Sequence, residues 1–482
     1  MSTQPGIYSY GTYLPLFRLD RKLIGEAIQG GGGKGTRSVA GHDEDTTTFG
    51  VAAARRAVQP IGGAGAIGSI WFASTEPPYL DKTNATAIHD AIAAPDGAAA
   101  YDVNGAVRSG IGALRAGLTQ GEPSLVVLSD MRSGLPGGTD EASGGDGAAA
   151  LVVGAGSTYD SLCDLIGAAS QTAEFLDRWR EPGETASKSW EDRFGEQILS
   201  PLATATITKA LEVAGVDLAD VDHLVVAGSH ERAVRGLRKK LGAKARSTVA
   251  DPSGTIGNTG TAQLGLLLAD ALDIAEPGQV VAALHVADGA DALVFRVTDA
   301  LPRWRQQRAA HTDPAIPISY ATYLLWRKQL HREPPRRPDP DVPAAPAAFR
   351  ERRWKFAFRG SRCDVCDTVH LPPQRVCASC GAVDQMTAEP VADATGRIFT
   401  VTADHLAFSE APPMAVAIVD LDGGGRVQCE LTDLAGELPA IGDAVEMTFR
   451  KAYTVNGIHN YVWKARPIRS AAPGVQREEA HG

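Results

Sequence analysis

The stretch of sequence that decides the fold is 101–118, YDVNGAVRSGIGALRAGL, together with its counterpart 250–272, ADPSGTIGNTGTAQLGLLLADAL. Each begins as an extended segment, passes through a turn that contains glycine, and continues as an apolar helix. Glycine lacks a Cβ atom, so such turns allow two backbones to approach closely. We therefore predict two central helices that begin close to each other, one in each half of a duplicated unit.

The segments around these helices repeat in the same order in both halves. A helical run, 49–58, precedes the strand 68–75, as the helical run 204–214 precedes the strand 221–229. The apolar strands that follow the central helices are 124–130 and 145–154 in the first half, and 279–288 and 287–297 in the second. Apolar strands that alternate with helices are typical of α/β proteins with buried sheets. The sequence predicts a duplicated α/β unit with halves at 1–165 and 166–332.

Three separated blocks resemble archaeal-type hydroxymethylglutaryl-CoA synthases of the thiolase superfamily. They are GTRSVAGHDEDTTTFGVAAARRAV (35–58), GNTGTAQLGLLLADALDIAEPGQ (257–279) and ISYATYLLWRK (318–328). The resemblance covers roughly residues 5 to 330. It implies the five-layer αβαβα fold of that superfamily, an acyl-CoA substrate, coenzyme A-dependent chemistry at a carbon–carbon bond, and a homodimer.

The nucleophile that this resemblance implies is missing. The family has a cysteine where the first central helix begins, because a thiolate gains there from the helix N-terminus and accepts the acyl group. This chain has Val107 at that position, and Ser109 lies on another side of the helix. Cys163 and Cys429 are the cysteines that remain for thiol chemistry. We expect no acyl-enzyme.

The general acid/base glutamate of the family is also displaced. Thr75 stands at its position, with Glu76 next to it, and a shift by one residue in an extended segment sends a side chain to the other face. The resemblance implies that His230 hydrogen-bonds the substrate carbonyl and that Asn258 polarises the thioester or ketone oxygen. The candidate catalytic residues are His230, Asn258, His285, Asp288, Glu76 and Tyr79, and the candidate CoA-binding residues are Arg108 and Arg235.

Several of these candidates have alternative interpretations. His285 and Asp288 replace small residues of the family, so they fit either a new acid/base pair or a structural role. Tyr79 fits an acid or a packing residue. The basic residues between Trp326 and Arg362 fit either a solvated surface or a contact with a polyanion such as the coenzyme phosphates.

Four cysteines, Cys363, Cys366, Cys377 and Cys380, form the pattern C-x2-C-x10-C-x2-C. Two such turns present four thiolates to one tetrahedral Zn²⁺, which leaves no open position for a substrate, so the predicted zinc is structural. Disulfides are the alternative, but the N-terminal sequence has no signal peptide, and paired cysteines inside the cell favour metal. This region resembles the acyl-CoA-associated zinc-ribbon plus OB-fold family (domain of unknown function 35). We predict a zinc ribbon at 351–388 and a small all-β OB-fold barrel at 389–472.

The remaining segments complete the expected organisation. A proline-rich linker at 333–350 joins the two parts, and a disordered tail follows at 473–482. The formal net charge of −10 argues against general affinity for nucleic acids, and no apolar stretch is long enough to cross a membrane. We expect a cytoplasmic protein.

Three functions are open at this point. Aldol or retro-aldol chemistry on a 3-hydroxyacyl-CoA needs an enolate but no acyl-enzyme, and cysteine-less thiolase-fold aldolases of steroid side-chain degradation, which work with zinc-ribbon/OB partners, give it a precedent by resemblance. The second is a condensing acyltransferase of the hydroxymethylglutaryl-CoA synthase type. The third is a non-catalytic acyl-CoA-binding scaffold that docks a separate thiolase or another acyl-CoA enzyme.

Overall fold

The computed structural model describes residues 4–156, 159–308, 315–333, 336, 338 and 340–469. They form two compact units. The first unit is Met1–Arg308, Pro317–Ala357 and Phe449–Val462, and the second is Ala309–Ile316, Phe358–Thr448 and Trp463–Gly482. The predicted disordered tail at 473–482 lies outside the described residues, as do four residues of the predicted linker.

A nine-stranded sheet runs through the first unit, and its order shows the duplication. In sheet order the strands are β11 (His223–Gly228), β12 (Val280–Val286), β13 (Gly289–Val297), β8 (Cys163–Thr172), β1 (Pro5–Tyr13), β7 (Asp146–Ala155), β6 (Ser124–Met131), β4 (Ser69–Ala73) and β5 (Ala99–Asp102). In the first half β4 and β6 are parallel while β7 is antiparallel to β6 and β1. In the second half β11 and β12 are parallel while β13 is antiparallel to β12 and β8. The halves meet where β1 pairs with β8.

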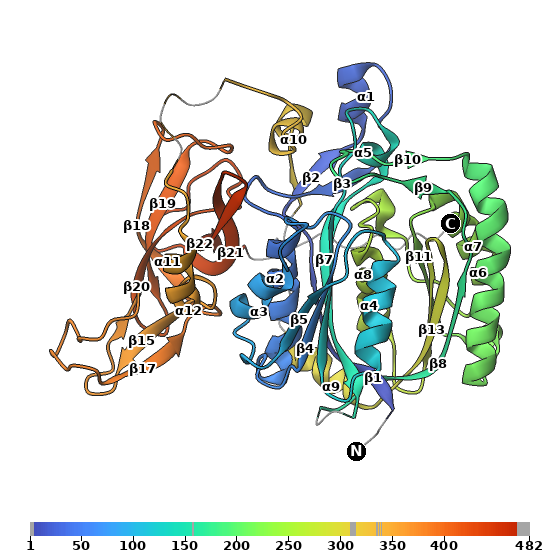
Figure 1. Ribbon diagram of the computed structural model, residues 1–482, viewed down its shortest axis with the longest axis horizontal. Coiled ribbons are helices and arrows are strands. Elements are labelled where there is room, and N and C mark those ends of the chain that lie inside the picture. Colours follow the sequence, from blue (N-terminus) through green and yellow to red (C-terminus); the bar gives the residue numbers. More distant parts are fainter. Residues whose placement is uncertain are drawn as a thin grey trace. The chain divides into compact units, whose positions relative to one another are not determined.

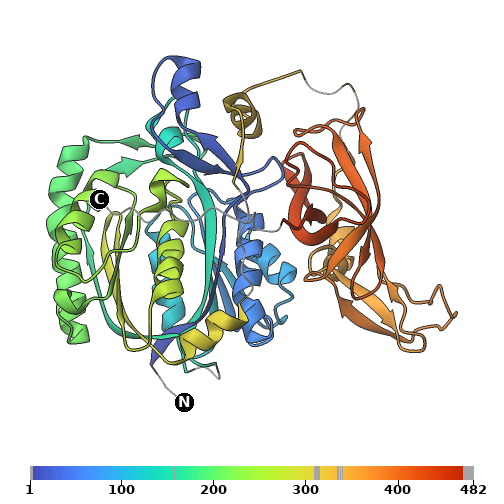
Figure 2. The same ribbon diagram turned by 180° about the vertical axis from the view of Figure 1, so that it is seen from behind.

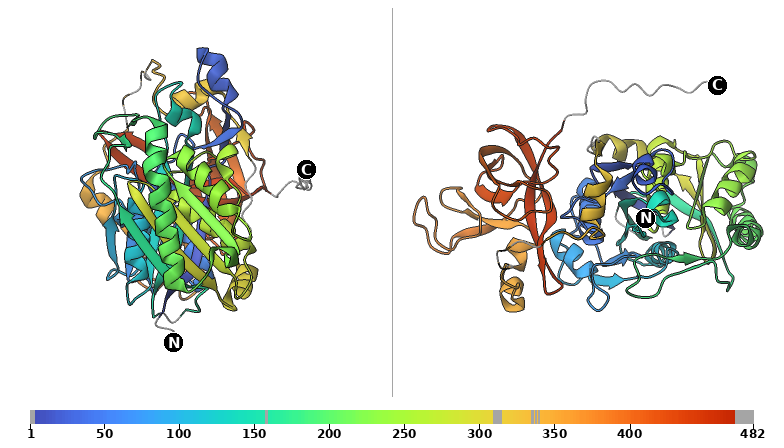
Figure 3. Two further views of the ribbon diagram at one scale, coloured as in Figure 1. Left: turned by 90° about the vertical axis from the view of Figure 1, so that its right-hand side faces the viewer. Right: turned by 90° about the horizontal axis from the view of Figure 1, so that it is seen from above.

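Helices cover both halves of the sheet and fill the space between them. The outer helices are α2 (Thr46–Val58) and α3 (Ala85–Ala91) on the first half, and α6 (Asp192–Ala214) and α7 (Glu231–Gly242) on the second. The central helices α4 (Ser109–Leu118) and α8 (Ala262–Ile274) lie between the two halves (Figures 1 and 2). The left view of Figure 3 shows the green helix α6 lying across strands of the second half, with which it is in contact. The predicted five-layer αβαβα fold is confirmed.

The two central helices begin in contact with each other. A Cβ atom added at Gly110, in the first turn of α4, would lie 2.6 Å from the Thr261 methyl group at the start of α8. Only glycine allows this approach without a shift of the neighbour. Apolar residues of both helices, among them Leu114 and Leu268, are almost completely buried in one core cluster.

The first unit also contains several shorter elements. They are β2 (Phe17–Asp20), α1 (Lys22–Ile28), β3 (Thr36–Val39), α5 (Thr139–Ser143), β9 (Arg178–Trp179), β10 (Lys188–Ser189) and α10 (Tyr320–Trp326). Helices α9 (Ala300–Gln307), α11 (Ala345–Arg350) and α12 (Arg352–Lys355) complete the helices of the described residues in the first unit.

Residues Phe449–Val462, which count with the first unit, come from the hairpin of β21 (Ala444–Val455) and β22 (Ile458–Pro467). The buried guanidinium of Arg450 lies 3.1 Å from a carboxylate oxygen of Glu44. The Tyr461 hydroxyl donates to Asp45, whose other oxygen caps α2 by accepting from the Thr48 amide. The acidic run that begins at Asp43 is therefore held by side chains far away in the sequence.

The second unit contains two small antiparallel sheets. One has the order β16 (Val369–His370), β15 (Arg359–Cys363) and β17 (Met386–Pro390). The other has the order β20 (Arg426–Glu430), β19 (Met414–Leu421), β18 (Thr395–Asp404), β21 and β22. Burial alternates along β19, as expected for a strand with one face in a core. Across the described ranges of the chain, no helix combines the length and the apolar character needed to span a bilayer.

Candidate functional site

A pocket of about 320 Å³ lies in the first unit, next to the residues that follow β6 and β11. Its lining comes from the residues after β6 and β11, from the turns before α4 and α8, and from the segment between β8 and the first turn of α6. The residues that carry the argument below are Val107, Arg132, Asp177, Arg178, His230 and Asn258. The pocket therefore brings Val107, His230 and Asn258 together.

His230 is oriented by the helix that it begins. It is the N-cap of α7, and its Nδ1 accepts a hydrogen bond of 3.1 Å from the Ala233 amide. Because Nδ1 is an acceptor, Nε2 carries the proton in the neutral ring. The buried Nε2 has no hydrogen-bond partner in the described part of the chain, and it lies 3.8 Å from Asp177 Oδ1. His230 therefore directs a donor toward the pocket.

Asp177 shares the pocket with this donor. Burial raises the pKa of the Asp177 carboxyl, whereas the His230 ring acts in the opposite direction. The two side chains are close because Gly195, in the first turn of α6, leaves room for them. A Cβ atom at Gly195 would lie 2.5 Å from both His230 Nε2 and Asp177 Oδ1. A carboxyl group with a raised pKa beside an imidazole is suited to proton transfer.

Asn258 is fixed by the backbone around it. Its Nδ2 donates to the Gly228 carbonyl and its Oδ1 accepts from the Gly260 amide, each at 2.9 Å. Gly257 has a φ of +81°, and a Cβ atom there would lie 2.2 Å from the Gly144 carbonyl oxygen. The turn thus depends on glycine, and it leaves the second proton of Nδ2 as the donor that Asn258 offers the pocket.

No thiol lines the pocket among the described residues. Val107 contributes its side chain two residues before α4, while the Ser109 hydroxyl turns back toward the Asn104 carbonyl. Cys163 is completely buried in the apolar core, and burial raises its pKa. Cys429 lies in β20 of the second unit, and burial raises its pKa too.

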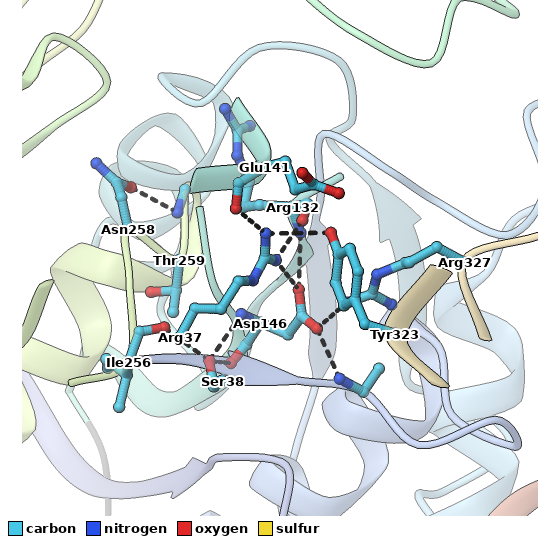
Figure 4. Close-up of polar contacts among 12 residues, drawn as sticks. Arg37, Ser38, Arg132, Glu141, Asp146, Ile256, Asn258, Thr259, Tyr323 and Arg327 are labelled. Carbon is cyan, nitrogen blue, oxygen red and sulfur yellow. Dashed lines mark hydrogen bonds and ion pairs between the residues drawn. The ribbon is translucent and has the colours of Figure 1, made fainter. Parts of the chain in front are cut away.

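A buried ion cluster fixes the wall of the pocket next to β7. Figure 4 shows the guanidinium groups of Arg37 and Arg327 directed toward the carboxylate of Asp146. Asp146 Oδ1 also accepts from the backbone amide of Arg132 at 3.0 Å, and Arg37 donates to the Arg132 carbonyl at 2.6 Å. The cluster joins the block at 35–58 to the closing segment at 318–328. The backbone amide and carbonyl of Arg132 are therefore both fixed by hydrogen bonds to side chains of this cluster.

The four cysteines of the second unit meet as predicted. Their sulfur atoms all lie within 4.8 Å of one another, with Cys363 and Cys380 at 3.7 Å and Cys366 and Cys377 at 3.5 Å. A Zn–S distance of about 2.3 Å places the sulfurs of a tetrahedral site about 3.8 Å apart. His370 Nε2 lies 3.4 Å from Cys377 Sγ and can support that ligand. The donor set fits a structural zinc ion.

Comparison with known proteins finds similarity in both parts of the chain. A family model described as the rubredoxin-like zinc ribbon domain of ChsH2 matches 356–384, and one described as the C-terminal OB-fold domain of ChsH2 matches 388–450. A hydroxymethylglutaryl-CoA synthase of Methanosphaera stadtmanae is 29% identical over 342 residues, which cover 67% of this chain and 97% of that protein. The synthase of Thermococcus gammatolerans is 28% identical over 339 residues, with coverage of 67% and 95%.

Solved structures share the fold of the first unit. MvaS in complex with 3-hydroxy-3-methylglutaryl coenzyme A has a TM-score of 0.58 at 18% identity, over 67% of this chain and 92% of that one. PksG, a HMG-CoA synthase from Bacillus subtilis, has a TM-score of 0.58 at 17% identity, over 67% and 88%. The chain joins a synthase-like thiolase fold to a ChsH2-type zinc ribbon and OB fold.

In this synthase-like unit, Thr75 and its neighbours are engaged by other side chains. Thr75 donates its hydroxyl to Asp130 and accepts from Arg132. The Glu76 carboxylate pairs with Arg180 and does not line the pocket. The Tyr79 hydroxyl accepts from the His459 amide at 2.7 Å, so it too points elsewhere.

The candidates on β12 and β13 form a second polar group outside the pocket lining. Arg108 donates to Asp291 at 3.0 Å and to the Asp288 carbonyl at 2.6 Å, and its remaining donors reach Ser170 and Gln171 of β8. His285 is buried opposite Asp291, and its Nδ1 has no hydrogen-bond partner within the described ranges.

Arg108 is therefore committed to the protein itself, and the Asp288 side chain is exposed at a tight turn. Arg235 is exposed on α7 and does not line the pocket. Of the eight candidates, the pocket lining includes His230 and Asn258.

Sequence reasoning missed Asp177, Arg132 and Arg178. Asp177 and Arg178 lie between β8 and α6, at and just before the two-residue strand β9, which is too short for a periodic pattern to predict the direction of side chains. The available signal was local: LDRWRE (176–181) carries four charges beside a tryptophan in a stretch that is neither helical nor strand-like. Arg132 was visible only as a charge that follows the apolar strand SLVVLSD.

Proposed function

We propose that this protein catalyses aldol or retro-aldol chemistry on a 3-hydroxyacyl-CoA through an enolate, without an acyl-enzyme. One observation carries the proposal. In a thiolase-fold pocket that holds His230 and Asn258, the helix start offers Val107, and no thiol lines the pocket in the described part of the chain. Hydrogen-bond donors that face a thioester oxygen stabilise an enolate, and this stabilisation does not require a covalent intermediate.

The retro-aldol step assigns a task to each group. The Asp177 carboxylate takes the proton of the 3-hydroxyl, and the electrons of that O–H bond form the new carbonyl. The C2–C3 bond breaks, and its electrons pass to the thioester enolate, whose oxygen accepts from His230 Nε2 and Asn258 Nδ2. The enolate carbon then takes the proton that Asp177 holds, which gives the shortened acyl-CoA and restores the Asp177 carboxylate. The raised pKa of Asp177 makes it a stronger base than an exposed aspartate.

Other residues have supporting roles in this proposal. Arg235, exposed on α7, contacts the phosphates of coenzyme A, and Arg108 positions the start of α4 through its bonds to β8 and β13. Zinc holds the ribbon together, and four thiolates leave it no position for substrate. The acyl-CoA ligand of the related synthases supports coenzyme A as the common part of the substrate.

The test is incubation of the purified full chain with a panel of 3-hydroxyacyl-CoAs. We expect release of an aldehyde or ketone together with a CoA ester that has lost the corresponding carbons. Incubation with labelled acetyl-CoA followed by intact mass measurement separates this proposal from a condensing acyltransferase. A stable acyl adduct on the protein would contradict the aldolase mechanism.

Association with other chains is part of the same proposal. β5 is the last strand in the sheet order and, among the described residues, pairs with β4; Tyr101 on it is 49% exposed. Such an edge can pair with a second copy, so we propose a homodimer. A separate thiolase is the alternative partner if the chain is a scaffold. Turnover that appears only with an added thiolase and survives His230→Ala would place the chemistry in that partner.

A further inference from the structure

A segment outside the nine-stranded sheet forms one wall of the pocket. Residues 173–191, between β8 and α6, contribute Asp177 and Arg178 to the lining and contain the short strands β9 and β10. Phe175 packs against the core at the start of the segment. In the described part of the chain, β9 and β10 pair with each other in a sheet of their own. A two-stranded hairpin is marginally stable by itself, so contacts of its side chains must keep it in place.

Two ion pairs connect this hairpin to the first half of the unit. Arg178 pairs at 2.7 Å with Asp140 of α5, beside which β9 and β10 lie in Figure 1. Arg180 pairs with Glu76 and also donates to the Thr75 carbonyl at 2.6 Å. The four charged side chains are 13–39% exposed, so water and salt screen these pairs less than pairs on the surface.

The position of Asp177 depends on this segment, whereas that of His230 does not. The Asp177 amide donates to the Phe175 carbonyl at 3.1 Å, and the Asp177 carbonyl accepts from the Trp190 amide at 2.8 Å. Both partners belong to the segment itself. His230 is fixed separately as the N-cap of α7. Contacts that hold residues 173–191 therefore set the distance of 3.8 Å between Asp177 Oδ1 and His230 Nε2.

We propose that Arg180 and Glu76 are positioning residues of this site. Their ion pair holds the segment 173–191 across the pocket and thereby sets the distance between Asp177 and His230. Neither Arg180 nor Glu76 is part of the pocket lining, so the pair acts through Asp177 and not on the substrate. The role of Asp177 as the base rests on the proposed function. Glu76, which the resemblance suggested as an acid/base residue, thus serves the reaction from outside the pocket.

Hydrogen–deuterium exchange of the full chain without ligand tests whether the pair holds the segment. Arg180→Met should raise the exchange rate of backbone amides in residues 173–191 at least about threefold. Glu76→Gln should have the same effect, because it breaks the same pair, and it serves as the test if Arg180→Met fails to fold. Lys188→Met is the matched control. It removes an ion pair with Glu184 that lies inside the segment, and it should leave the exchange of the segment unchanged.

The kinetics of 3-hydroxyacyl-CoA cleavage test whether the position of Asp177 matters for the reaction. Arg180→Met should lower kcat roughly 10- to 100-fold and change KM less than about threefold, while Lys188→Met should leave both unchanged. The combination of Arg180→Met with Glu76→Gln should lower kcat no further than either substitution alone, because the two side chains act as one pair. A pair with a purely structural role would lower the thermal midpoint without this loss of kcat in the folded protein.

Two results would overturn the proposal. Unchanged exchange of residues 173–191 in Arg180→Met and Glu76→Gln would show that the pair does not hold the segment, and this result needs no turnover. Raised exchange together with an unchanged kcat would show that the position of the segment does not limit the reaction. If the unmodified chain cleaves no 3-hydroxyacyl-CoA, the proposed function fails, and the exchange rates alone decide whether the pair holds the segment.

Discussion

The two halves of the thiolase-like unit place different chemistry at equivalent positions. Thr75 is the second residue after β4, and His230 is the second residue after β11. Val107 lies two residues before α4, and Gly260 lies two residues before α8. The second half thus supplies the imidazole of the pocket. The first half supplies an aliphatic side chain and a hydroxyl that is already hydrogen-bonded.

This difference indicates that the polar residues of the two halves have different roles. In the first half, Arg108 donates four hydrogen bonds to β8, β13 and the turn before β13, and Asp146 neutralises two buried arginines. These groups use their hydrogen-bonding capacity on the protein. His230 in the second half has a buried donor with no protein partner in the described chain. Groups without partners are the ones available to a substrate.

The largest expected effect is a loss of catalysis, caused by a substitution in the second half. His230→Ala removes the donor to the enolate oxygen and should lower kcat of retro-aldol cleavage by about 10²- to 10⁴-fold. Because the side-chain cap of α7 is lost as well, the free energy of unfolding should fall by about 1 kcal/mol. The measurement is single-turnover cleavage of a 3-hydroxyacyl-CoA. Arg108→Met is the first-half control and should lower the thermal midpoint more than kcat. A larger loss of kcat in Arg108→Met than in His230→Ala would reverse the assignment of the halves.

The next largest effect is a loss of folding stability, caused by a substitution in the first half. Asp146→Ala leaves the buried guanidinium groups of Arg37 and Arg327 without their shared counter-ion. Breaking such a cluster should lower the free energy of unfolding by about 3–5 kcal/mol, measured by urea denaturation. Asp160→Ala removes an exposed pair with Arg303, whose two side chains are 71% and 80% exposed, and should change almost nothing. Similar losses in both variants would contradict the structural role of Asp146.

A pH dependence should come from His285, the buried histidine opposite Asp291. Burial lowers its pKa to about 4, with Asp291 opposing and Arg108 supporting the shift, while in the unfolded chain the imidazole titrates near 6.5. Between these values the unfolded state binds the extra proton. Stability is therefore complete above pH 6.5 and falls as the pH drops toward 4, by about 2 kcal/mol at pH 5.

The measurement is the free energy of unfolding at pH 7 and pH 5 for the unmodified chain and for His285→Leu. Leucine cannot titrate, so the difference between the two pH values should shrink by that amount. An unchanged difference would mean that another group carries the pH dependence.

Much of this architecture could be predicted from the sequence, because it depends on local patterns. The duplicated order of helices and strands, the cysteine spacing and the glycine at the start of α4 are periodic or short-range signals. The pocket was predictable only where a motif fixed the residue, as with His230 and Asn258. Glu76 and Tyr79 were assigned from neighbours in sequence, but their side chains contact Arg180 and the backbone of His459. Such contacts between distant segments leave no trace in a local pattern.

The smallest expected effect tests how closely His230 and Asp177 must approach. Gly195→Ala adds a methyl group 2.5 Å from both side chains, so one of them must move. A displacement of this kind should lower kcat roughly tenfold, read in the same single-turnover assay. Gly112→Ala is the matched control, because Gly112 is also helical but a Cβ atom there meets nothing within 4 Å. It should keep full activity and gain about 0.5–1 kcal/mol of stability from helix propensity. If Gly195→Ala behaves like Gly112→Ala, the close contact of the imidazole and the carboxylate is not part of the mechanism. The base of the retro-aldol step must then be sought among the other acids of the lining, Asp140, Asp192 and Glu231.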